Sequence, residues 1–143
     1  EKVLSVVVKP GWKTGTKIRF PGEGDEVSPG TFQDIEFVIE QKPHAVYERD
    51  GDNLRAKLDI DIGEALAGFT RKIATLDGKE LAVSNRQVTQ PGAEMRFAGR
   101  GMPHQRDPSV RGDLVIVPRV RFPQSLTPRQ RELVLEAFPP KPA

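Results

Sequence analysis

Glycine and proline punctuate this chain so regularly that long helices have little room. The two residue types fill 26 of its 143 positions, 13 each, whereas their usual combined share is about 12%. Several stand in turn-forming pairs, at positions 10–11, 21–22, 77–78 and 91–92. This spacing excludes a helical bundle or a coiled coil, and it predicts short strands joined by turns.

The runs between these turns have the composition of β-strands. In residues 54–62 apolar and charged side chains alternate strictly, which is typical of a half-buried strand. The Asp-Gly pair at 77–78 predicts a hairpin, and Pro118 predicts an edge or a bulge in the last strand. The predicted strands are residues 3–8, 17–20, 34–41, 54–62, 71–75, 80–83 and 114–122.

Two helix signals interrupt the strands. Residues 61–68 begin with an Asp-x-x-Glu pattern and end in glycine, which predicts one capped helical turn. Near the C-terminus Thr127 and Gln130 form a capping box around a proline at the first helical position. Apolar residues then recur at helical spacing, so the sequence predicts a helix over 128–138.

Residue counts exclude several classes of function. Twenty-two basic against 20 acidic residues leave a net charge of +2, without the basic excess of a dedicated nucleic-acid binder. No apolar run is long enough to span a membrane. Without cysteine there is no disulfide, thiolate zinc site or cysteine nucleophile, which suits a reducing compartment. His44 and His104 both lie beside prolines, and we interpret them as surface residues.

Two patterns imitate chemical sites. Asp59 and Asp61 resemble paired catalytic carboxylates, but they lie on the polar face of an alternating strand with basic neighbours, so a solvated face is the better interpretation. The Gly-x-Gly pairs at 22–24 and 99–101 precede no helix and no Gly-Lys-Ser/Thr, so turn geometry explains them. No nucleophile and base support a hydrolase. We predict no enzymatic activity, no catalytic residue, no cofactor and no metal.

The chain contains a weak internal duplication. The same ordered residues occur twice, which indicates two copies of one β unit. The first copy has Pro10, Gly11, Arg19, Phe20, Gly22, Gly24, Asp34, Ile35 and Pro43, and the second has Pro91, Gly92, Arg96, Phe97, Gly99, Gly101, Asp113, Leu114 and Pro123.

The copies differ in what precedes them. A strand, a short helix and a hairpin stand before Pro91, whereas only nine residues stand before Pro10. We therefore expect a fragment of a longer protein whose first β unit is truncated. The predicted domains are 1–45, the C-terminal half of a first β domain; 46–124, a second β domain; and 125–143, a helix and tail.

With these residues in hand, the chain resembles the C-terminal client-binding region of DnaJ-type co-chaperones, the J-domain partners of the seventy-kilodalton heat-shock chaperone. Trp12 after Pro-Gly resembles the class without a zinc-finger insert, and no His-Pro-Asp tripeptide of a J domain occurs. The segments that carry the resemblance are 9–25 (KPGWKTGTKIRFPGEGD), 34–44 (DIEFVIEQKPH), 47–51 (YERDG), 64–69 (EALAGF), 75–78 (TLDG), 99–103 (GRGMP) and 111–114 (RGDL).

The resemblance implies a mainly β fold of two consecutive twisted β-sandwich-like units, with short helices and a C-terminal dimerisation helix. It implies binding of extended apolar segments of non-native polypeptides. We expect a cytoplasmic protein, with the nucleus left open as a second location. The resemblance further implies that the acidic C-terminal tail of the heat-shock chaperone docks in the first domain. Of the positions known for that groove, only Phe37 and Lys42 carry over to this chain.

The duplication extends this to a second groove. Ile116 and Arg121 follow Asp113 at the offsets at which Phe37 and Lys42 follow Asp34. We therefore predict a parallel groove built from Ile73 and Ile116, with Arg71 and Arg121 at its rim, which binds by strand addition or shallow contact. Plain core packing of the two isoleucines and a solvated strand end for Arg121 are the alternatives.

The terminal helix also has two interpretations. The resemblance assigns Leu133, Val134, Ala137 and Phe138 to a homodimer contact, but they could equally pack on the second β unit. A helix of about 11 residues is marginal alone, so it must dock on something.

A different class of function stays open. A structural subunit of a fixed assembly, such as a ciliary spoke in the axoneme, could reuse the same β scaffold. A co-chaperone binds many apolar peptides weakly, whereas a structural subunit binds one partner tightly.

Overall fold

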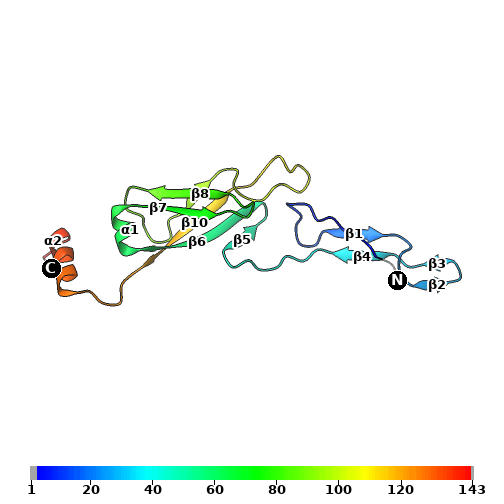
Figure 1. Cartoon of the computed structure of the whole chain (residues 1–143), viewed down its shortest axis with the longest axis horizontal. Helices are drawn as coiled ribbons and strands as arrows, with labels where there is room; N and C mark the ends of the chain where they lie inside the picture. The colour runs from blue at the N-terminus through cyan, green and yellow to red at the C-terminus, as the bar shows by residue number, and fades with distance from the viewer. Residues whose placement is uncertain (1–2, 143) are drawn as a thin grey trace. The chain divides into compact units, whose positions relative to one another are not determined.

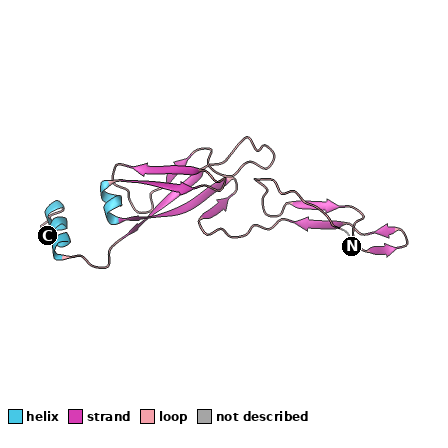
Figure 2. Ribbon diagram, in the orientation of Figure 1, coloured by secondary structure: helices cyan, strands magenta, loops and turns pink. Residues whose placement is uncertain are grey.

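A computed structural model of the chain describes residues 3–142 (Figure 1). Strands predominate over helices (Figure 2), which confirms the mainly β prediction. The strands are β1 (Lys17–Phe20), β2 (Glu26–Ser28), β3 (Thr31–Phe32), β4 (Ile35–Val38), β5 (Tyr47–Asp50), β6 (Asn53–Asp61), β7 (Phe69–Ala74), β8 (Glu80–Asn85), β9 (Met95–Phe97) and β10 (Leu114–Arg121); the helices are α1 (Ile62–Ala67) and α2 (Pro128–Ala137).

The strands form small antiparallel sheets. The largest has the order β5-β6-β10-β9, and three hairpin-like pairs join β1 with β4, β2 with β3 and β7 with β8. A turn at 50–53 links β5 to β6, where Asp50 pairs with Asn53 and Gly51 has a φ of 62°. The predicted hairpin at 77–78 links β7 to β8, where Gly78 has a φ of 80°. Positive φ values explain why glycine stands in both turns.

The chain divides into two compact units. Unit 1 comprises residues up to Lys57 together with Glu94–Val117, and unit 2 comprises Leu58–Ala93 with residues from Pro118 onward. Each unit has its own buried apolar residues: Tyr47, Leu54, Ala56, Leu114, Val115 and Ile116 in unit 1, and Ile60, Ala65, Phe69, Leu81 and Val83 in unit 2. The domain boundaries predicted from the sequence stay a prediction.

Both helices begin as their caps predict. In α2 the Gln130 N–H donates to the Thr127 hydroxyl at 3.1 Å, and the Thr127 N–H donates back to the Gln130 side chain at 2.9 Å. In α1 the Asp61 N–H donates to Glu64 at 3.2 Å, and Gly68 ends the helix with a φ of 101°. These reciprocal bonds satisfy N–H groups that a helix start leaves unpaired.

The two copies of the repeat fold into the same turn. In the first, Gly22 N–H donates to the Asp34 carboxylate at 2.9 Å, and Gly24 N–H donates to the Gln33 carbonyl at 2.6 Å. These bonds close the connection between β1 and β4, which also contains the β2–β3 pair, and Phe20 lies opposite Ile35.

In the second copy, Gly99 N–H donates to the Asp113 carboxylate at 3.3 Å, and Gly101 N–H donates to the Gly112 carbonyl at 2.8 Å. This turn joins β9 to β10, with Phe97 opposite Leu114. The agreement in hydrogen bonds and strand register supports the duplication that the sequence indicates. The second glycine of each pair is needed because the backbones approach closely: a Cβ on Gly24 would lie 2.8 Å from the Gln33 carbonyl oxygen, and one on Gly101 would lie 2.6 Å from the carbonyl carbon of Gly112.

One predicted strand is wrong. Residues 3–8 adopt no strand, and Val3 and Val7 are 86% and 78% exposed. Within residues 3–142 no strand pairs with this segment, and an apolar run without a partner cannot form a ladder. Conversely, β2, β3, β5 and β9 lie outside the predicted strands, because their short sequences carry little alternation.

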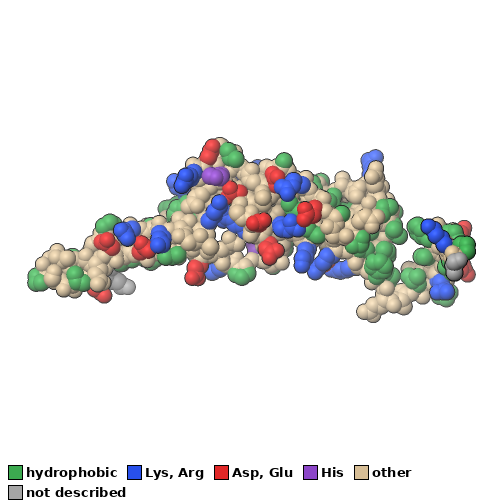
Figure 3. Space-filling model, turned by 180° about the vertical axis from the view of Figure 1, so that it is seen from behind, with side chains coloured by type: hydrophobic (Ala, Val, Ile, Leu, Met, Phe, Trp, Pro, Cys, Tyr) green, Lys and Arg blue, Asp and Glu red, His purple; other side chains and the backbone are tan. Residues whose placement is uncertain are grey.

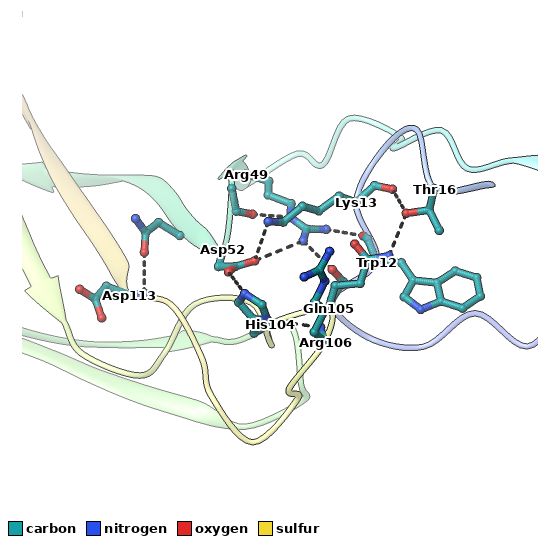
Figure 4. Close-up of polar contacts among 12 residues, drawn as sticks. Trp12, Lys13, Thr16, Arg49, Asp52, His104, Gln105, Arg106 and Asp113 are labelled. Carbon is teal, nitrogen blue, oxygen red and sulfur yellow. Dashed lines mark hydrogen bonds and ion pairs between the residues drawn. The ribbon is translucent and has the colours of Figure 1, made fainter. Parts of the chain in front are cut away.

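Arg49 fastens the Pro-Gly-Trp turn to β5 inside unit 1. Its guanidinium donates to the carbonyls of Trp12 at 2.6 Å, Gly11 at 2.9 Å and Gly51 at 2.7 Å, and its side chain is only 10% exposed (Figure 4). Asp52 lies 3.4 Å from the Lys13 ammonium nitrogen and 3.9 Å from Arg49. We call this set of contacts the Arg49 clasp.

The clasp leads to a stability prediction. Replacing Arg49 with lysine removes the planar fork that reaches three carbonyls, so the free energy of unfolding should fall by about 1–3 kcal/mol. Denaturant unfolding followed by the emission of Trp12, the sole tryptophan, measures it. The control, Arg55→Lys, alters an exposed pair with Glu94 and should cost below about 1 kcal/mol. Equal losses would contradict the role given to Arg49.

A second prediction concerns the glycine before Asp113. A Cβ on Gly112 would lie 2.8 Å from the Asn53 amide oxygen and closer still to the Asp52 carbonyl oxygen, so Gly112→Ala should destabilise the protein by about 2–4 kcal/mol. The matched change Gly63→Ala, in α1, meets no atom within 4 Å and should stabilise by up to about 1 kcal/mol. Thermal unfolding of both variants provides the comparison, and a neutral Gly112→Ala would refute the close approach.

Candidate functional site

The β1–β4 pair carries one apolar face. Ile18 lies opposite Phe37 and Phe20 lies opposite Ile35 in the antiparallel register, and directly opposed residues share a face. The Phe20 and Phe37 rings meet edge to face, with centroids 5.7 Å apart and planes at 84°. Phe37 is 43% exposed, so a large part of this ring is open to a ligand.

The opposite face of the same pair is charged. Glu36 lies 3.4 Å from Arg19 and 3.8 Å from Lys17. The contrast between the two faces assigns the apolar contact surface of this strand pair to the side that carries Phe37.

Lys42 lies just beyond this strand pair. Backbone bonds between Thr16 and Ile39 at 2.9 Å, and between Gly15 and Ile39 at 2.8 Å, extend the pairing past the end of β4. The exposed Lys42 follows three residues later and makes no hydrogen bond or ion pair with any residue in 3–142. Its ammonium group is thus available to a ligand.

The counterpart of Phe37 in the second copy lies in the core. Ile116 pairs with Met95 across β10 and β9 and is 1% exposed, as the core-packing alternative expects. Its side chain has almost no surface for a ligand to contact. Ile73 lies on β7, opposite Leu81 of β8, and is partly buried. Ile73 belongs to unit 2 and Ile116 to unit 1, so a groove that combines them stays a prediction.

The counterpart of Lys42 is already paired. Arg121 donates one hydrogen bond to the Asp59 carboxylate at 2.6 Å. Arg119 donates two hydrogen bonds to the same carboxylate, at 2.6 and 3.0 Å. Hydrogen bonds first from Arg119 and then from Arg121 lower the pKa of Asp59 to about 2. Sequence reasoning missed Arg119 and treated Asp59 as solvated, because the adjacency of the two strands is not visible in either one.

Arg71 is paired as well. Its guanidinium donates to both oxygens of Glu64, at 2.5 and 3.0 Å. The hydrogen bond from Arg71 lowers the pKa of Glu64, and Glu64 in turn raises the pKa of Arg71. Both bases predicted at the rim of the second groove therefore have internal carboxylate partners.

Helix α2 presents its apolar residues to solvent. None of its residues is buried; Leu133 and Val134 are 46% and 48% exposed, and Phe138 at its C-terminal cap is 61% exposed. Ala137 is exposed too. Apolar side chains gather on this helix, at the right-hand end of Figure 3. A short amphipathic helix with no buried residue is suited to a contact with another surface.

The histidines serve in local turns. The Nδ1 of His44 accepts from the N–H groups of Val46 and Tyr47 at 3.0 and 3.2 Å, and Nδ1 of His104 accepts from Arg106 at 3.2 Å. Among the described residues, no three His, Asp or Glu side chains converge as metal ligands would. In the same part of the chain, neither helix has the length and apolar character needed to cross a bilayer.

Comparison with known proteins identifies the architecture. Residues 1–123 match the family model described as the DnaJ C terminal domain. The chain is 51% identical to protein psi1 of Schizosaccharomyces pombe over 138 residues, 42% identical to human DnaJ homolog subfamily B member 5 over 139 residues, and 38% identical to protein SIS1 of Saccharomyces cerevisiae over 136 residues.

These alignments cover 96%, 97% and 94% of this chain, but only 36%, 40% and 39% of the respective relatives. The chain therefore spans well under half the length of the relatives that it matches. Similarity to a subfamily B member agrees with the Trp12 motif, which indicates the class without a zinc finger. With the family model matched over 123 residues, the chain belongs to the DnaJ C-terminal domain family.

Proposed function

We propose that this chain is the client-binding and dimerising part of a cytoplasmic co-chaperone that delivers non-native polypeptides to the seventy-kilodalton heat-shock chaperone. The observation that carries the proposal is the half-exposed aromatic pair of Phe20 and Phe37 on the apolar face of β1 and β4. Chaperone-related function follows from the family.

An extended apolar segment fits the β1–β4 pair for two reasons. An extended segment can pair with the edge of a strand through backbone hydrogen bonds, and β4 is the strand that carries Phe37. Phe37 offers apolar area beside that edge, and Lys42 offers a positive charge to an acidic neighbour of the bound segment. Backbone bonds are indifferent to sequence, so this surface suits many ligands with modest affinity.

The exposed apolar residues of α2 support a homodimer. A ten-residue helix is marginal in water by itself, and pairing of Leu133, Val134, Ala137 and Phe138 with a second copy would bury them symmetrically. Two peptide-binding surfaces in one dimer raise the effective affinity for a client with several apolar segments.

The first binding prediction concerns Phe37. Phe37→Ala should weaken binding to unrelated apolar peptides by roughly tenfold, because an aromatic side chain that a bound ligand covers contributes a large share of the binding energy. Fluorescence anisotropy with a panel of labelled extended peptides measures the dissociation constants. Phe32→Ala, a change of an equally exposed phenylalanine (48%) on β3, is the matched control and should leave affinity unchanged.

The breadth of the same panel separates the two classes of function. Weak binding to many peptides supports a co-chaperone. Binding to none of them, together with one tightly retained partner, would favour a structural subunit instead. Equal effects of Phe37→Ala and Phe32→Ala would remove the β1–β4 face from the proposal.

A further prediction concerns the proposed homodimer. Val134→Asp places a charge on the exposed apolar face of α2 and should convert a dimer into a monomer at micromolar concentration, since burial of an unpaired charge is costly. Sedimentation equilibrium measures the mass. Glu136→Gln, on the same helix, should leave it unchanged. A wild-type mass that equals the monomer at all concentrations would contradict the dimer.

A further inference from the structure

Unit 2 holds a carboxylate between two arginines on its surface. Arg119 contacts both oxygens of Asp59, through Nε at 2.6 Å and Nη2 at 3.0 Å, and Arg121 Nη2 adds a third bond of 2.6 Å. Two parallel bonds from one guanidinium to one carboxylate form the geometry with which proteins recognise free carboxylates. The pair therefore has the arrangement of a carboxylate-binding site.

This arrangement is open to solvent on the arginine side. The side chains of Arg119 and Arg121 are 59% and 67% exposed, whereas that of Asp59 is 27% exposed. A pair built only to stabilise the fold would gain little at such exposure, because water and salt screen surface ion pairs and the two long side chains lose entropy when they are held together. The exposed guanidiniums could instead meet a carboxylate that comes from outside, if Asp59 did not already hold them.

Asp59 is a permanent occupant of the pair. Its lowered pKa, about 2 because of the bonds from Arg119 and Arg121, keeps it ionised throughout the pH range in which proteins of this kind work. It is also tethered on the neighbouring strand, which gives it an effective concentration that a dilute ligand cannot match. Protonation therefore cannot release the arginines near neutral pH.

Arg71, a further arginine of unit 2, is also paired with a carboxylate of the same unit. Arg71 is held by Glu64 at 2.5 and 3.0 Å, and Asp61 and Asp59 add weaker favourable charge. By contrast, Lys42 in the first copy has no such partner in residues 3–142.

We propose that Arg119 and Arg121 form a carboxylate-binding site for acidic peptide segments that Asp59 occupies from within, so that Asp59 is a specificity-determining residue. It restricts acid-flanked segments to the surface with Phe37 and Lys42. This inference deepens the proposed peptide-binding function and rests on it.

The test compares two labelled peptides, one neutral and apolar and the other identical except for two flanking glutamates. Asp59→Asn keeps the shape of the side chain and removes its charge. We expect it to tighten binding of the acidic peptide by about threefold to tenfold at about 0.05 M salt, with little gain at about 0.5 M salt. The neutral peptide should bind as it does to the wild type.

Two controls assign the gain to the arginine pair. Glu80→Gln removes one exposed negative charge of unit 2 at the start of β8 and should give no comparable gain. Adding Arg119→Gln and Arg121→Gln to Asp59→Asn should abolish the gain. If Asp59→Asn and Glu80→Gln behave alike, or if the gain survives loss of both arginines, the proposal is overturned.

A second comparison keeps Asp59 and so does not depend on whether Asp59→Asn folds. Arg86 and Arg100 are exposed arginines whose side chains make no hydrogen bond or ion pair within residues 3–142. In the otherwise unchanged chain, Arg119→Gln with Arg121→Gln should alter acidic-peptide affinity no more than Arg86→Gln with Arg100→Gln, because Asp59 already occupies the first pair. A selective loss of roughly threefold or more would show an open site and refute the proposal. If the neutral peptide still binds but Asp59→Asn does not tighten binding of the acidic peptide, only this inference is refuted. If neither peptide binds to any variant, the proposed peptide-binding function is refuted as well.

Discussion

A carboxylate that caps a glycine turn sets the architecture of both copies of the repeat. Asp34 accepts the N–H of Gly22 at 2.9 Å, and Asp113 accepts that of Gly99 at 3.3 Å. Each aspartate stands immediately before a strand, so its bond fixes where that strand starts relative to its partner. A slip of one residue would turn every side chain to the other face, and the apolar face that carries Phe37 would be lost.

The same scaffold then carries two different surfaces. Three residues after the capping aspartate, the first copy places a 43% exposed Phe37 and the second a 1% exposed Ile116. Eight residues after it, the first copy has a lysine without a partner among the described residues, whereas Arg121 is bound to Asp59. The contact surface therefore depends on what neighbouring strands contribute, and the repeat alone does not determine it.

Much of the local structure could be predicted from the sequence, because local interactions produce it. The alternation in 54–62 indicates the long strand β6, and the capping box at Thr127 and Gln130 indicates the start of α2. The failures share one physical cause: they depend on neighbours that are distant in the sequence. The apolar run 3–8 resembles a strand but has no partner strand in the part of the chain that the structure describes, and the pairing of Arg119 with Asp59 joins residues 60 positions apart.

The most direct test of this account follows backbone amide signals of the isotope-labelled chain by nuclear magnetic resonance during titration with an apolar peptide that carries flanking glutamates. The signals of β1, β4 and Lys42 should shift together and saturate, because an exposed apolar strand face lies there beside Lys42, which has no partner among the described residues. The signals of Arg119 and Arg121 should stay in place. Saturable shifts centred on Arg119 and Arg121, with those of Phe37 and Lys42 unmoved, would contradict it.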